Sequence, residues 1–137
     1  MKSSQIAEEK MEKAKRLFSS LLFSLIVLCL SAAPSWTQES VIAMCEKTAQ
    51  VFPEQGTGCE CALTAIKDQI SSDEFEIYAN VGTLYLDNIT DGLARSEAWD
   101  AAAKKIGDER GMSLREVLTI TNPIGQLHAD AIKNCAS

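Results

Sequence analysis

The stretch SSDEFEIYANVGTLY, residues 71–85, has the broadest apolar helical pattern in the chain. Ser71 followed by Glu74 is the pattern of a capping box, in which the two side chains bond each other's backbone amides at a helix N-terminus. Beyond it, apolar residues recur along two helical lines, with Phe75, Tyr78, Gly82 and Tyr85 on one and Ile77, Val81 and Leu84 on the other. A helix that is apolar over so broad a front must be enclosed by other elements. The stretch is therefore predicted to form the central helix of the domain.

Helical spacing continues upstream of this stretch. Residues 38–52 carry one apolar stripe with charged residues outside it, and residues 53–56 (PEQG) are expected to end that helix. Thr57 with Glu60 matches a second capping box, which predicts a short helix over the residues that follow. No segment of useful length alternates apolar and polar residues, as a half-buried strand would.

Downstream, residues 87–92 interrupt the helical pattern, and residues 96–106 resume it. Gly107 is expected to end that helix, since glycine is the usual residue just past a helix C-terminus. A third capping-box match, Ser113 with Glu116, predicts the start of the next helix. Asn122-Pro123 resembles an N-cap followed by proline at the first helical position, so a separate last helix is expected there. The fold class is predicted to be all-α, a compact bundle of five or six short helices.

The amino-terminal segment has the order of a secretory signal peptide. Residues 1–16 carry five basic and three acidic side chains, residues 17–30 form an uncharged 14-residue run, and small residues follow. The run is shorter than the ~20 apolar residues of a membrane-spanning helix. We expect residues 1–35 to be removed by cleavage before Trp36, and the alternative is a retained membrane anchor. Translation from Met11 would give a more ordinary leader.

Composition limits the possible functions of the remaining chain. The full sequence has 137 residues and a formal charge of −6, whereas residues 36–137, expected to form a single helical domain, hold 16 acidic and 8 basic side chains. This acidic balance argues against a nucleic-acid partner, and membrane contact is expected only through an uncleaved leader. One histidine excludes metal sites with two or more His ligands. Because no phosphate loop, zinc signature or nucleophile motif is present, we expect no catalytic residue, cofactor or metal.

Four cysteines remain once Cys29 is removed with the leader: Cys45, Cys59, Cys61 and Cys135. Four cysteines allow three pairings of two disulfides. A bridge between Cys59 and Cys61 would close a very tight ring, so we favour a bridge from each of them to a different segment, one to Cys45 and one to Cys135. The alternatives are a redox-active pair in Cys59-Glu60-Cys61 and a four-cysteine zinc site. Export to an oxidising compartment favours structural disulfides over both.

Four further features have a functional and a plain structural interpretation. Residues 104–119 have the pattern of a helix-turn-helix motif. A DNA-binding motif needs several basic residues at the start of its second helix, but only Arg115 is there. Asn88-Ile89-Thr90 matches an N-glycosylation acceptor. His128 lies at the edge of the last apolar stripe and is expected at the domain boundary or surface rather than in a catalytic role. The carboxylates at positions 73, 74 and 76 are expected to complement a helix dipole rather than to bind metal.

Together these features predict a small exported protein, periplasmic or secreted, that acts as a non-catalytic binding or interaction module for a protein or a small ligand. One alternative is an acid-stress periplasmic chaperone, since the chain resembles that class in its general plan of a small acidic exported helical domain with internal disulfides. Loss of carboxylate charge between roughly pH 5 and 3 would then loosen the domain. A second alternative is a thiol oxidoreductase that uses Cys59 and Cys61.

Overall fold

The computed structural model describes residues 36–51 and 58–136, and this part of the chain contains five α-helices and no strand. The helices are α2 (Trp36–Val51), α3 (Cys59–Lys67), α4 (Ser72–Thr90), α5 (Arg95–Arg110) and α6 (Leu114–Cys135). All five belong to one compact unit, Ser35–Ser137. The all-α prediction is thus confirmed for these residues. The predicted leader, Cys29, the predicted helix end at residues 53–56 and the predicted cap at Thr57 lie outside the described residues.

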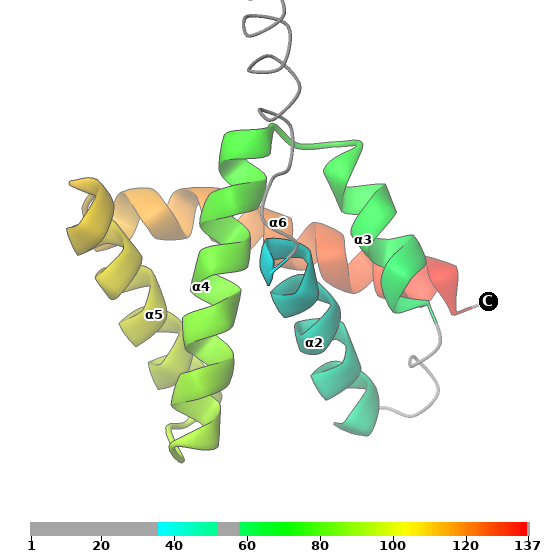
Figure 1. Cartoon of the computed structure of the whole chain (residues 1–137), viewed down its shortest axis with the longest axis horizontal. Helices are drawn as coiled ribbons and strands as arrows, with labels where there is room; N and C mark the ends of the chain where they lie inside the picture. The colour runs from blue at the N-terminus through cyan, green and yellow to red at the C-terminus, as the bar shows by residue number, and fades with distance from the viewer. Residues whose placement is uncertain (1–35, 52–57, 137) are drawn as a thin grey trace, which may run out of the picture. The chain divides into compact units, whose positions relative to one another are not determined.

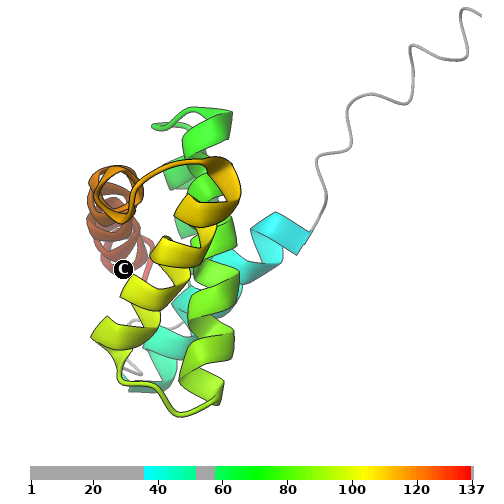
Figure 2. The same cartoon turned by 90° about the vertical axis from the view of Figure 1, so that its left-hand side faces the viewer.

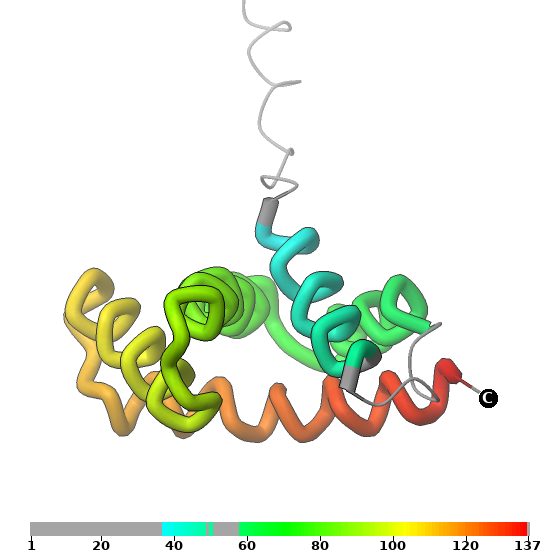
Figure 3. Tube along the Cα trace, turned by 90° about the horizontal axis from the view of Figure 1, so that it is seen from below, coloured from blue at the N-terminus to red at the C-terminus, as the bar shows by residue number. Residues whose placement is uncertain are grey.

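The longest helix, α6, packs against α3, α4 and α5, whereas α2 packs mainly against α4 and α3. Figure 3 shows α2, α3, α4 and α5 on one side of α6, which runs crosswise to α4 in Figure 1. α4 and α5 lie side by side (Figure 2), and α4 also contacts α2 and α6. The central position predicted for residues 71–85 is therefore confirmed. None of the helices described here is long and apolar enough to cross a membrane.

α4 occupies the centre because its capping box and its apolar front both form as the sequence indicates. The backbone N–H of Ser71 donates to Glu74 Oε2 at 2.9 Å, and the backbone N–H of Glu74 donates to Ser71 Oγ at 3.3 Å. On the buried side of α4, Ser40 Oγ of α2 donates to the backbone carbonyl of Ala79 at 2.9 Å. The buried residues of α4 are Phe75, Ile77, Tyr78, Ala79, Val81 and Gly82.

The core consists of two adjoining apolar clusters along α4. One joins α2 and α3 to the carboxyl-terminal half of α6, and the other joins α5 to the amino-terminal half of α6. Three half-buried side chains, Tyr85, Trp99 and Ile120, pack against both clusters. The long helix α6 therefore connects the two halves of the core.

The predicted C-terminal end of α5 is wrong. Gly107 lies inside α5, and the helix ends at Gly111, whose φ of +68° is the left-handed conformation of a helix terminus. Gly107 is needed for packing instead, since a Cβ there would lie 2.7 Å from the carbonyl oxygen of Met112 as the chain turns toward α6. Residues 104–119 do form two helices joined by a short turn.

The separate last helix predicted at Asn122-Pro123 does not exist, because α6 is continuous and Pro123 lies inside it. Proline removes one backbone hydrogen bond from a helix interior and usually kinks or ends the helix. Here the exposed ring faces away from the core, while Val117, Thr121 and Ile124 on the inner face are all buried. Burial on both sides of the proline keeps the two halves in one helix.

The boundaries of α3 and α4 also differ from expectation. α3 has Gly58 at its N-cap and no side-chain cap, because the chain terminus lies too close: a Cβ at Gly58 would lie 2.5 Å from Cβ of Cys135. α4 continues through Thr90, so the possible glycosylation acceptor lies in a helix rather than in a loop. Asn88 Nδ2 donates to the carbonyl of Ala98 at 3.0 Å, and this bond occupies the nitrogen that a glycan would need.

We expect Ser71→Ala to lower the free energy of unfolding by about 1 kcal/mol, because it removes the cap of the central helix. The hydrogen bonds from Ser71 also hold the pKa of the Glu74 carboxyl below its ordinary value, which shows that the pair favours the ionised carboxylate. Urea unfolding at pH 7 measures the change. Ser72→Ala, one position later and equally exposed, is the matched control and is expected to change stability by less than about 0.5 kcal/mol. Equal effects of the two variants would contradict the capping role.

Candidate functional site

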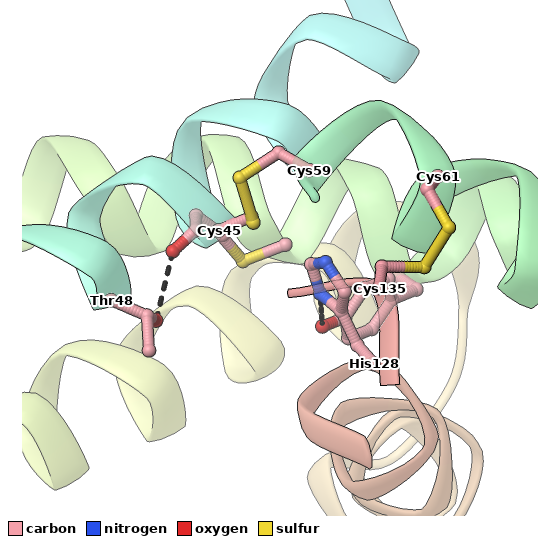
Figure 4. The surroundings of a disulfide bond; sticks show 8 residues. Cys45, Thr48, Cys59, Cys61, His128 and Cys135 are labelled. Carbon is pink, nitrogen blue, oxygen red and sulfur yellow. Dashed lines mark hydrogen bonds between the residues drawn. A yellow bond between two sulfur atoms is a disulfide. The ribbon is translucent and has the colours of Figure 1, made fainter. Parts of the chain in front are cut away.

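Two disulfides join α3 to its neighbours. Cys59 is bonded to Cys45 of α2 with a Cα–Cα distance of 5.6 Å, and Cys61 is bonded to Cys135 of α6 with a Cα–Cα distance of 5.9 Å (Figure 4). The predicted pairing is confirmed: the two neighbouring cysteines staple to different segments. Since each is bonded elsewhere, Cys59 and Cys61 do not form a dithiol pair with each other in this structure. Among the residues described, no group of three His, Cys, Asp or Glu side chains is placed to hold a metal ion.

A cleft of about 580 Å³ opens between α2, α4, α5 and α6, and Thr48 and His128 of its lining lie near the disulfides in Figure 4. Its volume is in the range of sites that bind small molecules, roughly 300–1,000 Å³. Residues from all four helices line it, although they are far apart in sequence. The lining residues are Met44, Lys47, Thr48, Tyr78, Tyr85, Arg95, Ser96, Trp99, Asp100, Thr121, Asn122, Gly125, His128, Ala129 and Ile132.

Three aromatic rings form one wall of this cleft. Trp99 of α5 meets Tyr85 edge-on, with ring centroids 5.3 Å apart, and lies 6.0 Å from Tyr78 at a tilted angle. Its indole Nε1–H donates to Asn122 Oδ1 of α6 at 3.2 Å, which fixes the ring against rotation. Edge-to-face pairs of this kind are stabilising beyond the area that they bury. The wall is therefore held in place before any ligand arrives.

The inner end of the cleft contains a hydrogen-bonded pair, Tyr78 of α4 and His128 of α6. The phenolic oxygen of Tyr78 lies 2.9 Å from Nδ1 of His128, and the two rings meet edge-on. His128 is only 4% exposed, so the expectation of a boundary or surface histidine is wrong. The tertiary fold buries it because α6 runs under α4, and the edge of its apolar stripe faces Tyr78 rather than solvent.

Burial shifts the pKa values of both members of the pair. Removal from water lowers the pKa of His128 to about 4 and raises the pKa of Tyr78 above its ordinary range, so both are neutral near pH 7. A neutral imidazole carries one N–H. If the Tyr78 hydroxyl donates to Nδ1 of His128, the ring proton of His128 is on Nε2. The hydroxyl donor of Tyr78 and the acceptor at Nδ1 are then paired with each other. The reverse arrangement would leave the Tyr78 hydroxyl proton without an acceptor.

Nε2 of His128 is the buried side-chain polar atom that has no hydrogen-bond partner among the described residues. Leaving a buried donor unpaired costs ~1–3 kcal/mol, so such groups are rare in native proteins. His128 also lines the cleft. His128 thus brings a buried polar atom without a partner to the lining of an aromatic cleft, and a few polar groups in an apolar cleft are typical of a small-molecule binding site.

The sequence alone did not single out this site. Tyr78 and Tyr85 lie on the apolar line of the central helix, where tyrosines usually complete a core, and Trp99 lies in the next segment of helical pattern, residues 96–106. No local motif links them to His128, 50 residues after Tyr78. Comparison of the chain with known protein families, curated proteins and solved structures found no match. The geometry of the cleft is therefore the basis for a functional assignment.

Proposed function

We propose that this chain is an exported, non-catalytic binding protein whose aromatic cleft takes a small planar ligand with a hydrogen-bond acceptor. The observation that carries the proposal is the preformed aromatic wall beside the unpaired Nε2 of His128. A flat ring is favoured because it can pack against Trp99 and Tyr85 over a large apolar area. The acceptor is favoured because Nε2 of His128 is a buried side-chain atom that lacks a partner among the described residues.

Binding is favoured over catalysis by the state of the polar groups. A general base is most effective when its pKa lies near the working pH, whereas the pKa of His128 is about 4 and its Nδ1 is already bonded to Tyr78. Tyr78 is a neutral phenol whose pKa is raised further by burial. These groups orient a ligand but are poorly suited to move a proton at neutral pH.

The disulfides support the same function by holding the cleft open in one geometry. Cys59 ties α3 to α2, and Cys61 ties α3 to α6, and both α2 and α6 contribute walls of the cleft (Figure 4). A site whose walls are fixed in advance loses less conformational entropy when a ligand binds. Two disulfides in a domain of this size are also typical of proteins that fold in an oxidising compartment. Export with cleavage before Trp36 would be read from the intact mass of the expressed full chain.

A cleft-filling substitution tests the proposal. Gly125 of α6 lines the cleft, and a Cβ there would meet nothing closer than Tyr78 Cε2 at 4.0 Å. The probe is 2-naphthaleneethanol, a neutral alcohol with a planar ring. Because so small a molecule makes few contacts, we expect it to bind with Kd on the order of 1 mM. We expect Gly125→Leu to weaken binding at least tenfold, because the new side chain occupies the site of the ring.

Gly125→Ala is the matched control, since it removes the same glycine but adds only one methyl group. Binding is measured by titration of ¹⁵N–¹H correlation spectra, which also show whether the shifts cluster at cleft residues and whether each variant stays folded. If 2-naphthaleneethanol does not perturb the cleft, or if Gly125→Leu binds it as well as the wild type does, the cleft is not the site.

An acid-stress chaperone is the second candidate, and the observation that favours it is the burial of a neutral histidine between α4 and α6. Protonation of His128 would place a charge in the core and loosen those helices, exposing apolar faces. Prevention of client aggregation at pH 4, measured by light scattering with reduced lysozyme as the client, tests this role. Scattering unchanged by a stoichiometric amount of the protein would exclude it.

A further inference from the structure

The cleft carries an unusual charge for this protein. Lys47 of α2 and Arg95 of α5 both line it and are both exposed, and neither forms an ion pair within the part of the chain that the structure describes. The basic residues that do pair there, Lys104, Lys105, Arg110 and Lys133, each have an acidic partner outside the cleft lining. The residues from 36 onward hold twice as many acidic as basic side chains, yet the cleft is left with two uncompensated cations and one carboxylate, Asp100.

The amino-terminal end of α5 adds to this positive character. Its N-cap, Ala94, has no side-chain oxygen to accept from the first backbone amides, unlike the serine caps of α4 and α6. The next two residues, Arg95 and Ser96, line the cleft. The N-terminus of a helix of this length carries a partial positive charge, and its free N–H groups favour an anion. The first residues of α5 and Lys47 of α2 therefore line the same cleft.

A cationic ligand is the main competitor, since aromatic faces attract cations and Asp100 would pair with one. Two observations oppose it. Lys47 and Arg95 would repel a cation at the opening, and a single carboxylate does not outweigh them. The rings also meet edge-on or tilted rather than with parallel faces, and each of the two tyrosines packs against Trp99 at a large interplanar angle.

We propose that the cleft selects an aromatic carboxylate, with the ring packed against Trp99 and Tyr85 and the carboxylate held at the opening by Lys47, Arg95 and the α5 N-terminus. This proposal rests on the proposed function, since it names the ligand class of the same cleft. Side-chain and helix-end contacts are both partly solvated, so they provide selectivity more than tight binding.

Three matched probes test the charge preference: 2-naphthylacetate, the neutral 2-naphthaleneethanol and the cationic 2-(2-naphthyl)ethylamine. They share one ring and nearly one shape. At pH 7 and 20 mM NaCl we expect the carboxylate to bind about 3- to 10-fold more tightly than the alcohol, and the amine to bind more weakly than the alcohol. At 500 mM NaCl the advantage of the carboxylate is expected to fall below about twofold, because salt screens exposed charges.

Charge-removing variants locate the preference. In a double variant, Lys47→Gln with Arg95→Gln, the ratio of carboxylate to alcohol affinity is expected to fall below about twofold at low salt. Arg115→Gln is the matched control, because it removes an exposed cation outside the cleft lining, and it is expected to keep the wild-type ratio. Spectra of each variant show that the fold is retained.

The possible failures are distinguishable. If none of the three probes perturbs the cleft, the proposed function fails and the selectivity fails with it. If the alcohol or the amine binds as tightly as the carboxylate does, the cleft remains a binding site and the proposed ligand class is wrong. If Arg115→Gln lowers the ratio as much as the double variant does, the preference comes from overall charge and not from Lys47 and Arg95, which also overturns the proposal.

Discussion

Replacing Cys61 and Cys135 together by alanine is expected to lower the free energy of unfolding by about 4 kcal/mol. Their disulfide joins residues 74 positions apart, and a cross-link across so long a loop strongly restricts the unfolded chain. Cys61 is exposed and Cys135 is half-buried, so the substitution removes little core packing. Small domains are typically stable by only ~5–15 kcal/mol, so the loss is a large share of the total.

Urea unfolding at pH 7, with the linear extrapolation to water, measures this loss. The matched control replaces the exposed neighbours Glu60 and Asn134 by alanine, which keeps the disulfide and is expected to change stability by less than about 1 kcal/mol. The variant is also expected to bind 2-naphthaleneethanol more weakly, because α6 is then no longer tied to α3. A double Cys variant as stable as the control would show that the long loop does not depend on its cross-link.

Lowering the pH from 7 to 5 is expected to reduce the free energy of unfolding by about 2 kcal/mol through His128. The pKa of His128 is about 4 in the folded protein and about 6.5 in an unfolded chain. As the pH falls through 6.5, the unfolded chain takes up a proton that the folded protein does not bind, so the unfolded state is favoured. The contribution is complete above pH 6.5 and is lost as the pH falls toward 4.

The single histidine of the chain makes this measurement clean. Urea unfolding at pH 7, 6 and 5 is compared between the wild type and His128→Gln, whose amide oxygen can still accept from Tyr78 but does not titrate. The carboxyls of the two capping boxes, Glu74 and Glu116, have lowered pKa values and stay ionised in this range. His128→Gln is expected to be less stable at pH 7 and nearly independent of pH. Parallel pH profiles would rule out His128 as the cause.

The acid response connects the two candidate functions. If the fall in stability is confirmed, the pair that completes the inner end of the cleft is also the part of the core most sensitive to acid. In protonated His128 both ring nitrogens carry protons, so Nδ1 could no longer accept the hydrogen bond from the Tyr78 hydroxyl. Ligand affinity should therefore decline below about pH 5 together with stability.

Local rules were enough to predict most of the helices. The capping boxes at Ser71 and Ser113 formed as expected, because they depend on residues only three positions apart. The pairing of Cys59 and Cys61 with different segments was also predictable, since ring size alone disfavours a bridge between them. These features are set by geometry within a few residues of the chain.

Features that depend on packing were not predictable in the same way. Gly107 and Pro123 carry helix-ending signals, and both lie inside helices because the neighbouring chain or the buried inner face of α6 overrides the local preference. The N-cap of α3 is Gly58, and Cys135, 77 residues later, lies against it. The contact at Gly58 joins segments far apart in sequence, whereas Gly107 meets Met112 only five residues later and Pro123 is held by the buried inner face of α6.

The helical class, the central helix, the acidic balance and the absence of a Cys59–Cys61 bridge follow from the sequence, whereas the choice of Cys45 for Cys59 and of Cys135 for Cys61 comes from the tertiary structure. The tertiary structure also brings Tyr78, Trp99 and His128 into one cleft with Lys47 and Arg95. The physical reason is that tyrosine, tryptophan and histidine on an apolar helix face give the same sequence pattern whether they fill a core or line a cavity. The difference lies in whether the facing helix supplies atoms to fill the space, and for α4, α5 and α6 that depends on how they cross.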